Sequence, residues 1–179
     1  MRSQINGLNQ AVNNANDAIG LIQTAEGAMT ETHSMLQRMK TLTTQAANGT
    51  YTKTARDNIQ AEVDALNKEI TRIASTTKFN GETPLSPANK GQNLTFFIGA
   101  TADATNAMTV GQLTMTAAAL TIDRIKVDTT TSAFKAMASV DAAIEKVSTY
   151  RAALGAAQNR LEHTCLLYTS PSPRDKRQS

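Results

Sequence analysis

The sequence predicts a mainly α-helical fold, namely a long, rod-like antiparallel helical bundle with coiled-coil packing and a small β-hairpin excursion. Three observations predict it. Apolar residues recur at alternating steps of three and four in three separate stretches of the chain. Hydrophobic residues make up 40% of the chain but aromatic residues only 4%, which favours thin helical packing over a thick globular core. Between the second and third stretches, Pro and Gly interrupt the helical pattern.

The first helix is predicted over residues 1–47. At 1.5 Å per residue it is about 70 Å long, too long for a compact domain of this size. Asn48-Gly49 ends it, because Gly readily adopts the left-handed conformation that follows a helix. No helix start precedes Ile5, so we expect residue 1 to lie already inside a helix and the chain to be truncated there. The predicted bundle seam of this helix consists of Ile5, Leu8, Val12, Ile19, Ile22 and Leu36.

Two further helices are predicted, over residues 54–76 and 132–164. Thr54 to Asp57 has the form of a capping box, and Ser132 can cap the last helix. The first two helices are joined by a short turn and should therefore pack antiparallel. The predicted seams comprise Ile59, Val63, Leu66 and Ile70 in the second helix and Val140, Ile144, Val147, Leu154 and Leu161 in the third.

The residues between the second and third helices are predicted to form short β-hairpins. Phe79-Asn80-Gly81 indicates a tight turn, and Pro84 and Pro87 exclude helix. Strands are predicted at Leu94–Gly99, Met108–Val110 and Leu113–Met115. The chain is thus divided into N-terminal helices over residues 1–77, a β-hairpin and variable segment over 78–131, and a C-terminal helix over 132–164.

The formal net charge of +3 lies mostly in the last fifteen residues. There Arg174, Lys176 and Arg177 against Asp175 give +2, which leaves +1 for residues 1–164. The absence of a Lys/Arg cluster in that body argues against nucleic-acid binding. Residues 165–175 resemble a translated sequencing adapter, so residues 165–179 are predicted to be a non-native tail that replaces the true C-terminus.

The sequence carries few signals that indicate a cellular compartment. No stretch approaches the roughly 20 apolar residues that a membrane span needs, so no membrane partner is expected. No cleavable signal peptide is apparent, and export would then need a dedicated machine. The single Cys165 forbids an internal disulfide.

The residues offer no pattern typical of an enzyme. Neither a Gly-rich phosphate loop nor a nucleophile elbow is present. Glu26 and His33 occupy seam positions of the first helix, and Arg151 interrupts the seam of the last. Only one other histidine, His163, exists, so a structural role for His33 is favoured over metal binding. We therefore expect no catalytic, cofactor or metal site.

Several collinear segments of the chain carry a resemblance to one protein family. Near the N-terminus they are Ile5–Ala18, Thr24–Ala28, Leu36–Met39, Gln45–Thr50, Ile59–Val63 and Phe79–Gly81, and near the C-terminus Val147–Glu162. The first six resemble the N-terminal conserved region of bacterial flagellin, and the last is similar to its C-terminal conserved helix. The resemblance covers about residues 1–100 and 132–164, while residues 101–131 match weakly.

This resemblance implies a structural subunit of the flagellar filament that serves motility. The helices would form the rod-like bundle of the filament shell. The implied partners are other flagellin subunits, a flagellar export chaperone and the filament capping protein. The implied location is extracellular, in the flagellum, after export through the flagellar type III apparatus. The terminal helices that line the filament core in this family would precede residue 1 and follow residue 162, so we expect this chain to fold but not to polymerise.

The resemblance also implies a possible host partner, a Toll-like receptor. The stretch Gln37–Gln45 is similar to the flagellin segment that this receptor recognises, and it keeps Arg38 and Leu42. Glu62 matches a further contact on the neighbouring helix. Thr41, Thr43 and Thr44 depart from the family pattern, and ordinary seam packing is an alternative interpretation of Leu42.

Two alternatives to flagellin stay open. A hook–filament junction protein related to flagellin would share much of this pattern, although the run from Ala15 to Thr50 fits flagellin better. A helical coiled-coil module for signalling or secretion, such as a chemoreceptor bundle, would continue as a long helical hairpin without the β excursion.

Overall fold

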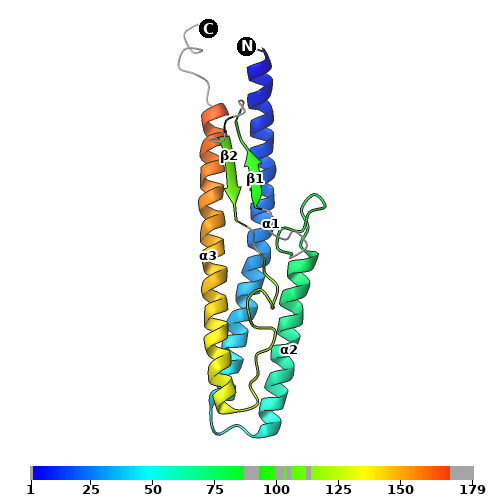
Figure 1. Cartoon of the computed structure of the whole chain (residues 1–179), viewed down its shortest axis with the longest axis vertical. Coiled ribbons are helices and arrows are strands. Elements are labelled where there is room, and N and C mark those ends of the chain that lie inside the picture. Colours follow the sequence, from blue (N-terminus) through cyan, green and yellow to red (C-terminus); the bar gives the residue numbers. More distant parts are fainter. Residues whose placement is uncertain (1, 87–92, 100–102, 104–105, 112–113, 170–179) are drawn as a thin grey trace.

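The computed structural model describes residues 2–86, 93–99, 103, 106–111 and 114–169. Its elements are α1 (Arg2–Ala47), α2 (Lys53–Thr76), β1 (Leu94–Phe97), β2 (Ala107–Val110) and α3 (Thr130–Thr169). They form an elongated rod in which α1 runs antiparallel to both α2 and α3 (Figure 1). The predicted fold class, a long helical bundle with a small hairpin, is confirmed.

The α1–α2 turn lies where it was predicted, but its capping differs. The Arg56 guanidinium donates to the carbonyls of Ala46 at 2.9 Å and Asn48 at 3.0 Å, and a cation here stabilises the C-terminus of α1. The N-cap of α2 is Thr52, whose hydroxyl accepts from the backbone N–H of Ala55 at 3.3 Å. The predicted capping box at Thr54 is therefore wrong, because α2 has already begun at Lys53.

The bounds of α3 also differ from the prediction. The helix begins at Thr130, so Ser132 is not its cap. Instead Ser132 and Thr129 exchange hydrogen bonds, each backbone N–H donating to the other hydroxyl, at 3.1 and 2.9 Å. The Ser132 hydroxyl donates to Asp128, which holds the pKa of that carboxyl below its usual value. The helix continues past residue 164 to Thr169, so this part of the predicted tail is helical, and residues 170–179 lie outside the described residues.

In the described part of the chain, the β excursion contains one antiparallel pair of strands and an isolated antiparallel bridge between Phe79 and Glu82. Strands β1 and β2 pair from Leu94↔Val110 to Phe97↔Ala107, which confirms two predicted strands. The third is not formed at residues 114 and 115, and Leu113, like Pro87, lies outside the described residues. The tight turn is confirmed, since Asn80 and Gly81 have φ of 50° and 87°, as a type I′ turn requires.

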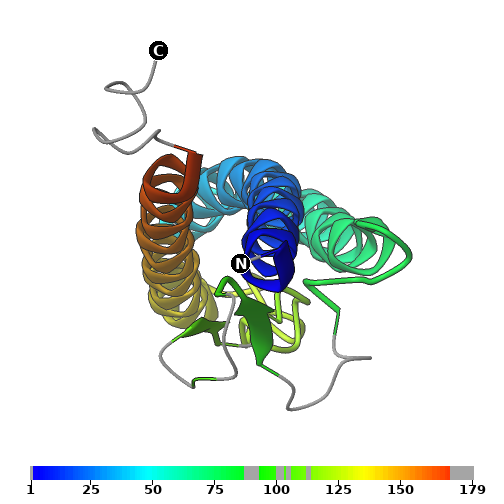
Figure 2. The ribbon, with the colours of Figure 1, turned by 90° about the horizontal axis from the view of Figure 1, so that it is seen from above.

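Residues 114–129, here called the strap, have no regular structure but belong to the core. The strap runs beside α2 and α3 and lies with the hairpin on one side of the helices (Figures 1 and 2). Its buried hydrophobic side chains are Met115, Ala117, Leu120, Ile122, Ile125 and Val127.

Three polar side chains of α2 hold the strap backbone. The Gln60 Oε1 accepts from the N–H of Val127 at 2.8 Å. The Asn67 amide donates to the carbonyl of Ile122 at 2.9 Å, and the Thr71 hydroxyl accepts from the N–H of Ala117 at 3.3 Å. These bonds give partners to backbone groups of an irregular, largely buried segment, although the Ile122 carbonyl also accepts from the N–H of Ile125.

The predicted seams are only partly in register with the observed core. Ile5 is 56% exposed, so its prediction as a seam residue is wrong. Buried seam residues are Ile22, Leu36, Ile59, Val63, Ile70, Val140, Val147, Leu154 and Leu161. Half-buried ones are Leu8, Val12, Ile19, Leu66 and Ile144.

Candidate functional site

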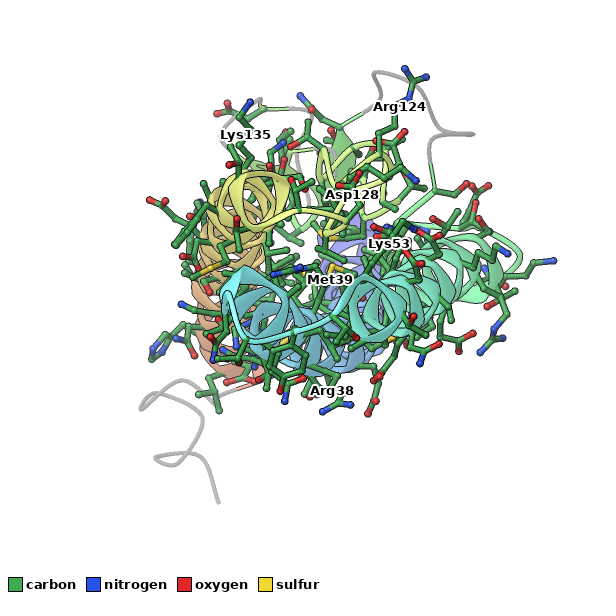
Figure 3. All side chains as sticks on the ribbon, turned by 90° about the horizontal axis from the view of Figure 1, so that it is seen from below. Arg38, Met39, Lys53, Arg124, Asp128 and Lys135 are labelled. Atoms are coloured by element: carbon green, nitrogen blue, oxygen red, sulfur yellow. The ribbon has the colours of Figure 1, made fainter. Side chains whose placement is uncertain are left out.

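The surface shared by α1 and α2 contains two of the three predicted receptor-contact residues. The Arg38 guanidinium on α1 pairs with the Glu62 carboxylate on α2 at 2.7 Å, and both side chains are about half exposed. Figure 3 shows Arg38 on the side of the bundle opposite Arg124 and Lys135. The structure thus brings a cation and an anion together on an accessible helix face.

Leu42 is not part of this surface. Its side chain is 2% exposed and belongs to the hydrophobic core. The prediction that Leu42 is a surface contact is therefore wrong for the isolated subunit, and the alternative, ordinary seam packing, describes its position. The spacing of Arg38 and Leu42 could not reveal this, because neighbours on one helix can still differ in exposure.

Polar residues on the facing seams of α1 and α3 meet each other. Arg151 lies 3.6 Å from the Glu26 carboxylate, and Lys40 pairs with Asp141 at 2.8 Å. The His33 Nε2 lies 3.3 Å from the amide of Gln37. The two ion pairs link α1 to α3, whereas the His33–Gln37 contact lies within α1. Of the predicted seam interruptions, Glu26 and Arg151 therefore have a role in aligning the two helices.

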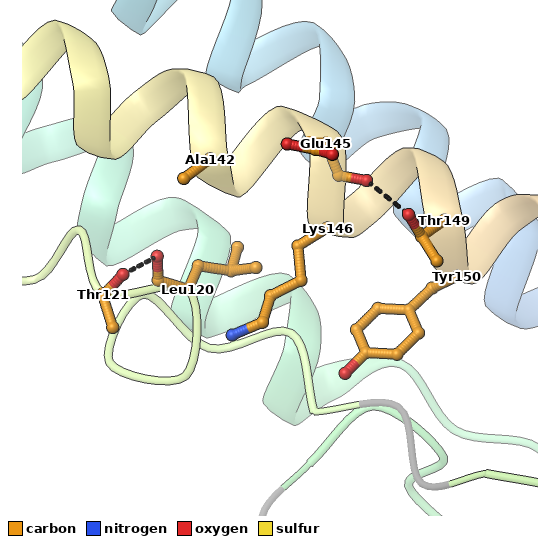
Figure 4. Close-up of a pocket in the computed structure, with 7 residues that line it drawn as sticks. All are labelled: Leu120, Thr121, Ala142, Glu145, Lys146, Thr149 and Tyr150. Atoms are coloured by element: carbon orange, nitrogen blue, oxygen red, sulfur yellow. Dashed lines mark hydrogen bonds between the residues drawn. The ribbon is translucent and has the colours of Figure 1, made fainter.

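A groove of about 380 Å³ lies between the strap and α3 (Figure 4). The Lys146 ammonium reaches across it and donates to the carbonyl of Ala119 at 2.9 Å. On the opposite side Thr121 has φ of 61°, unusual for a β-branched residue. The ammonium of Lys146 ties the strap to α3, so its position supports a structural role for this groove.

The described residues provide little for chemistry that uses a metal. Among them, no group of three or more His, Cys, Asp and Glu side chains is placed to hold a metal ion. Within the same ranges, no helix combines the length and apolar character needed to cross a membrane.

Comparisons with known proteins agree on one family. A family model described as the bacterial flagellin N-terminal helical region matches residues 1–90. The chain is 43% identical to a flagellin of Bacillus subtilis, over 92% of this chain and 64% of that protein. It is 42% identical to the flagellar filament 33 kDa core protein of Treponema phagedenis, over 93% of this chain and 62% of that protein. The chain thus spans somewhat less than two thirds of these relatives.

Solved structures show the same fold. The crystal structure of Bacillus cereus flagellin superposes with a TM-score of 0.75 at 29% identity, covering 93% of both chains. The structure of FliC from Burkholderia pseudomallei, at 18% identity, has a TM-score of 0.66 over 80% of this chain and 99% of that chain. The second likeness concerns the fold alone.

Proposed function

This chain belongs to the bacterial flagellin family, and from that premise we propose that it is a structural subunit of the flagellar filament and serves motility. The observation that carries the proposal is its identity of about 40% to filament proteins over more than nine tenths of its length. A rod of long helices suits this role, because heterologous contacts between identical rods build an open filament when their rotation does not close. No enzymatic activity is part of the proposal, since the family is structural.

We propose further that its partners are other flagellin subunits, a flagellar export chaperone and the filament capping protein. The proposed route is export through the flagellar type III apparatus without a cleavable signal peptide, and the proposed location is the extracellular filament. Membership of the family supports these partners and this route.

A chimera tests the filament role. Residues 2–164 would replace the matching segment of the Bacillus subtilis flagellin in a strain that lacks its own flagellin. We expect long filaments by electron microscopy and swimming in soft agar, because the substituted bundle presents the family's rod. Secreted, folded chimera that forms no filaments would contradict the proposal. Short stubs confined to the hook would instead favour the alternative of a junction protein.

We also propose that the paired Arg38 and Glu62 form a contact surface for a Toll-like receptor. Both side chains are about half exposed and bridge α1 and α2, and Arg is a favoured interface anchor. The buried Leu42 is left out of this surface. The proposal narrows the predicted contact to a charged pair on two helices.

Substitution of Arg38 by Ala is expected to weaken receptor activation roughly tenfold, as the loss of one interface anchor would. The measurement is a dose–response curve in receptor-reporter cells, with Arg160→Ala as a matched change on the exposed face of α3. Equal curves for the chain and its Arg38→Ala variant, or no response to either, would reject the proposed surface.

A further inference from the structure

A second groove lies between the strap and α3, near the start of that helix, and we call it the cationic groove. Its volume is about 320 Å³, at the small end of the range of ligand sites, which is about 300–1,000 Å³. The charged side chains that line it are Arg124 and Lys126 from the strap and Lys135 from α3, and all three are exposed. Figure 3 shows Arg124 and Lys135 on the same side of the bundle. The fold thus brings together cations from two separate elements.

The acidic side chains of the same two elements do not line the cationic groove, and all residues of the strap and of the first turns of α3 are described. Asp123 lines a different groove, between the strap and α2, although its carboxylate also lies 3.5 Å from the Arg124 Nε. Asp128 accepts from the Ser132 hydroxyl at 2.6 Å, and Asp141 pairs with α1 at 2.8 Å. The lining of the cationic groove is therefore positive, in a body that is close to neutral.

Three hydroxyl groups, those of Thr121, Ser132 and Ser139, also line the cationic groove. Each donates its proton within the chain, at 2.6, 2.6 and 3.2 Å respectively, to a backbone carbonyl or, for Ser132, to a carboxylate. A hydroxyl has one proton but two lone pairs, so its oxygen can still accept a hydrogen bond. The hydroxyl oxygens of Thr121 and Ser139 therefore face a ligand as acceptors.

The cations and the acceptor oxygens together select the chemistry of a ligand. Ammonium and guanidinium groups donate to oxyanions, and the fork of an Arg side chain matches the geometry of a phosphate or a sulfate. The acceptor oxygens need donors, which the hydroxyl groups of a sugar supply. A nucleic acid would gain from aromatic side chains that stack on its bases, and no aromatic residue is among those that line this groove. An added peptide strand would need a strand edge, which the irregular strap does not offer.

We propose that the cationic groove binds a sugar that carries a sulfate or phosphate group. Arg124 and Lys135 hold the oxyanion, and Lys126, which also lines the groove against α2, adds positive charge. The hydroxyl oxygens of Thr121 and Ser139 accept from the hydroxyl groups of the sugar. The inference goes beyond the proposed filament function and does not depend on it, because every group that it uses belongs to a single subunit.

The test is a titration of the full-length chain, followed through its backbone amide signals in NMR spectra. The probe is glucose 6-sulfate, and glucose 6-phosphate in a parallel arm shows which charged group binds more tightly. We expect saturable shifts of the amides from Thr121 to Lys126 at millimolar concentration. Glucose alone and inorganic sulfate alone should each bind roughly tenfold more weakly, because each supplies only part of the hydrogen bonding. The position of the shifted amides distinguishes this groove from the basic run near the C-terminus.

Charge-matched variants assign the binding to the named cations. Arg124→Gln and Lys135→Gln should each weaken the binding of glucose 6-sulfate roughly tenfold, with a melting temperature unchanged within about 2 °C. Arg160→Gln removes the same charge from an exposed position further along α3 and should weaken it less than about twofold. The absence of saturable shifts in both arms, equal affinity for inorganic sulfate, or an affinity indifferent to both groove variants overturns the inference. A phosphoserine peptide that binds more tightly than both sugars would assign the groove to a protein partner and would overturn it as well.

Discussion

Substitution of Leu154 by Ala is expected to lower the free energy of unfolding by about 2–5 kcal/mol. Leu154 lies on α3, its exposed fraction is 0%, and it belongs to the core shared with α1. Truncation loses the transfer free energy of the side chain and leaves a cavity that a rod of continuous helices can fill only partly. For a chain of this length, each kcal/mol lowers the melting temperature by about 2–4 °C. Denaturant and thermal unfolding followed by circular dichroism give both quantities.

The same helix supplies a control for this prediction. Leu166 is 64% exposed, so Leu166→Ala removes the same atoms from a site that is already in water. We expect a change within about 0.5 kcal/mol. If both variants lost the same stability, the effect would reflect helix content, and the seam between α1 and α3 would not be the source of the rod's stability.

The heptad pattern predicts the length and direction of the helices well, but it places the seam of α1 imperfectly. Leu8, Val12 and Ile19 were assigned to the seam because they are large and apolar, yet they are only half-buried. The fully buried positions of this part of α1 are mostly alanines, and they recur with the same alternating steps of four and three. They are Ala11, Ala15, Ala18, Ile22, Ala25 and Met29.

The shift has a physical reason. Small residues let two helices approach closely, and the distance between helix axes depends on the side chains at the contact. In an alanine-rich sequence, the position of closest approach is therefore occupied by Ala, and larger apolar residues flank it. A prediction that favours large apolar side chains therefore selects residues beside the seam in α1. In α3 the same criterion is correct, because Leu154 and Leu161 are fully buried.

The strap illustrates what periodicity cannot predict. Residues 114–129 follow neither a helical nor a strand pattern, so the sequence indicated only short hairpins there. Their burial depends on distant side chains that pair with an irregular backbone, and such pairing leaves no local pattern. One signal was available, since Gln60, Asn67 and Thr71 are polar residues at steps of seven and four and so lie on one side of the second helix.

The proposed receptor surface could also be predicted only in part from the sequence. The resemblance placed Arg38 and Glu62 on neighbouring helices, and the structure joins them in an ion pair. The exposure of Leu42 could not be deduced, because it depends on which elements cover that part of α1. Burial of a single residue is a property of the assembled bundle, and a motif specifies it only when its neighbours are also known.

Substitution of Gln60 by Leu is expected to destabilise the chain by about 2–4 kcal/mol, through the strap. The side chain accepts from Val127 and donates to the carbonyl of Ile125, so its loss leaves two strap groups without these partners. An unpaired donor or acceptor in the interior costs about 1–3 kcal/mol. Gln45→Leu is the matched control, since Gln45 is exposed on α1, and it should change stability by no more than about 0.5 kcal/mol.

Amide hydrogen exchange locates the effect of Gln60→Leu. The Val127 amide should exchange much faster in the variant. Amides in the middle of α1 should exchange faster only by the amount that the loss of global stability accounts for. Protection of Val127 that equals the native value would mean that burial of Ile122, Ile125 and Val127 is enough to hold the strap. In that case the hydrogen bonds from α2 would form because the strap is already in place, and they would not hold it there. Faster exchange at Val127 with unchanged protection in α1 would instead show that the polar side chains of α2 hold the strap in place, because Gln60 bonds that amide directly.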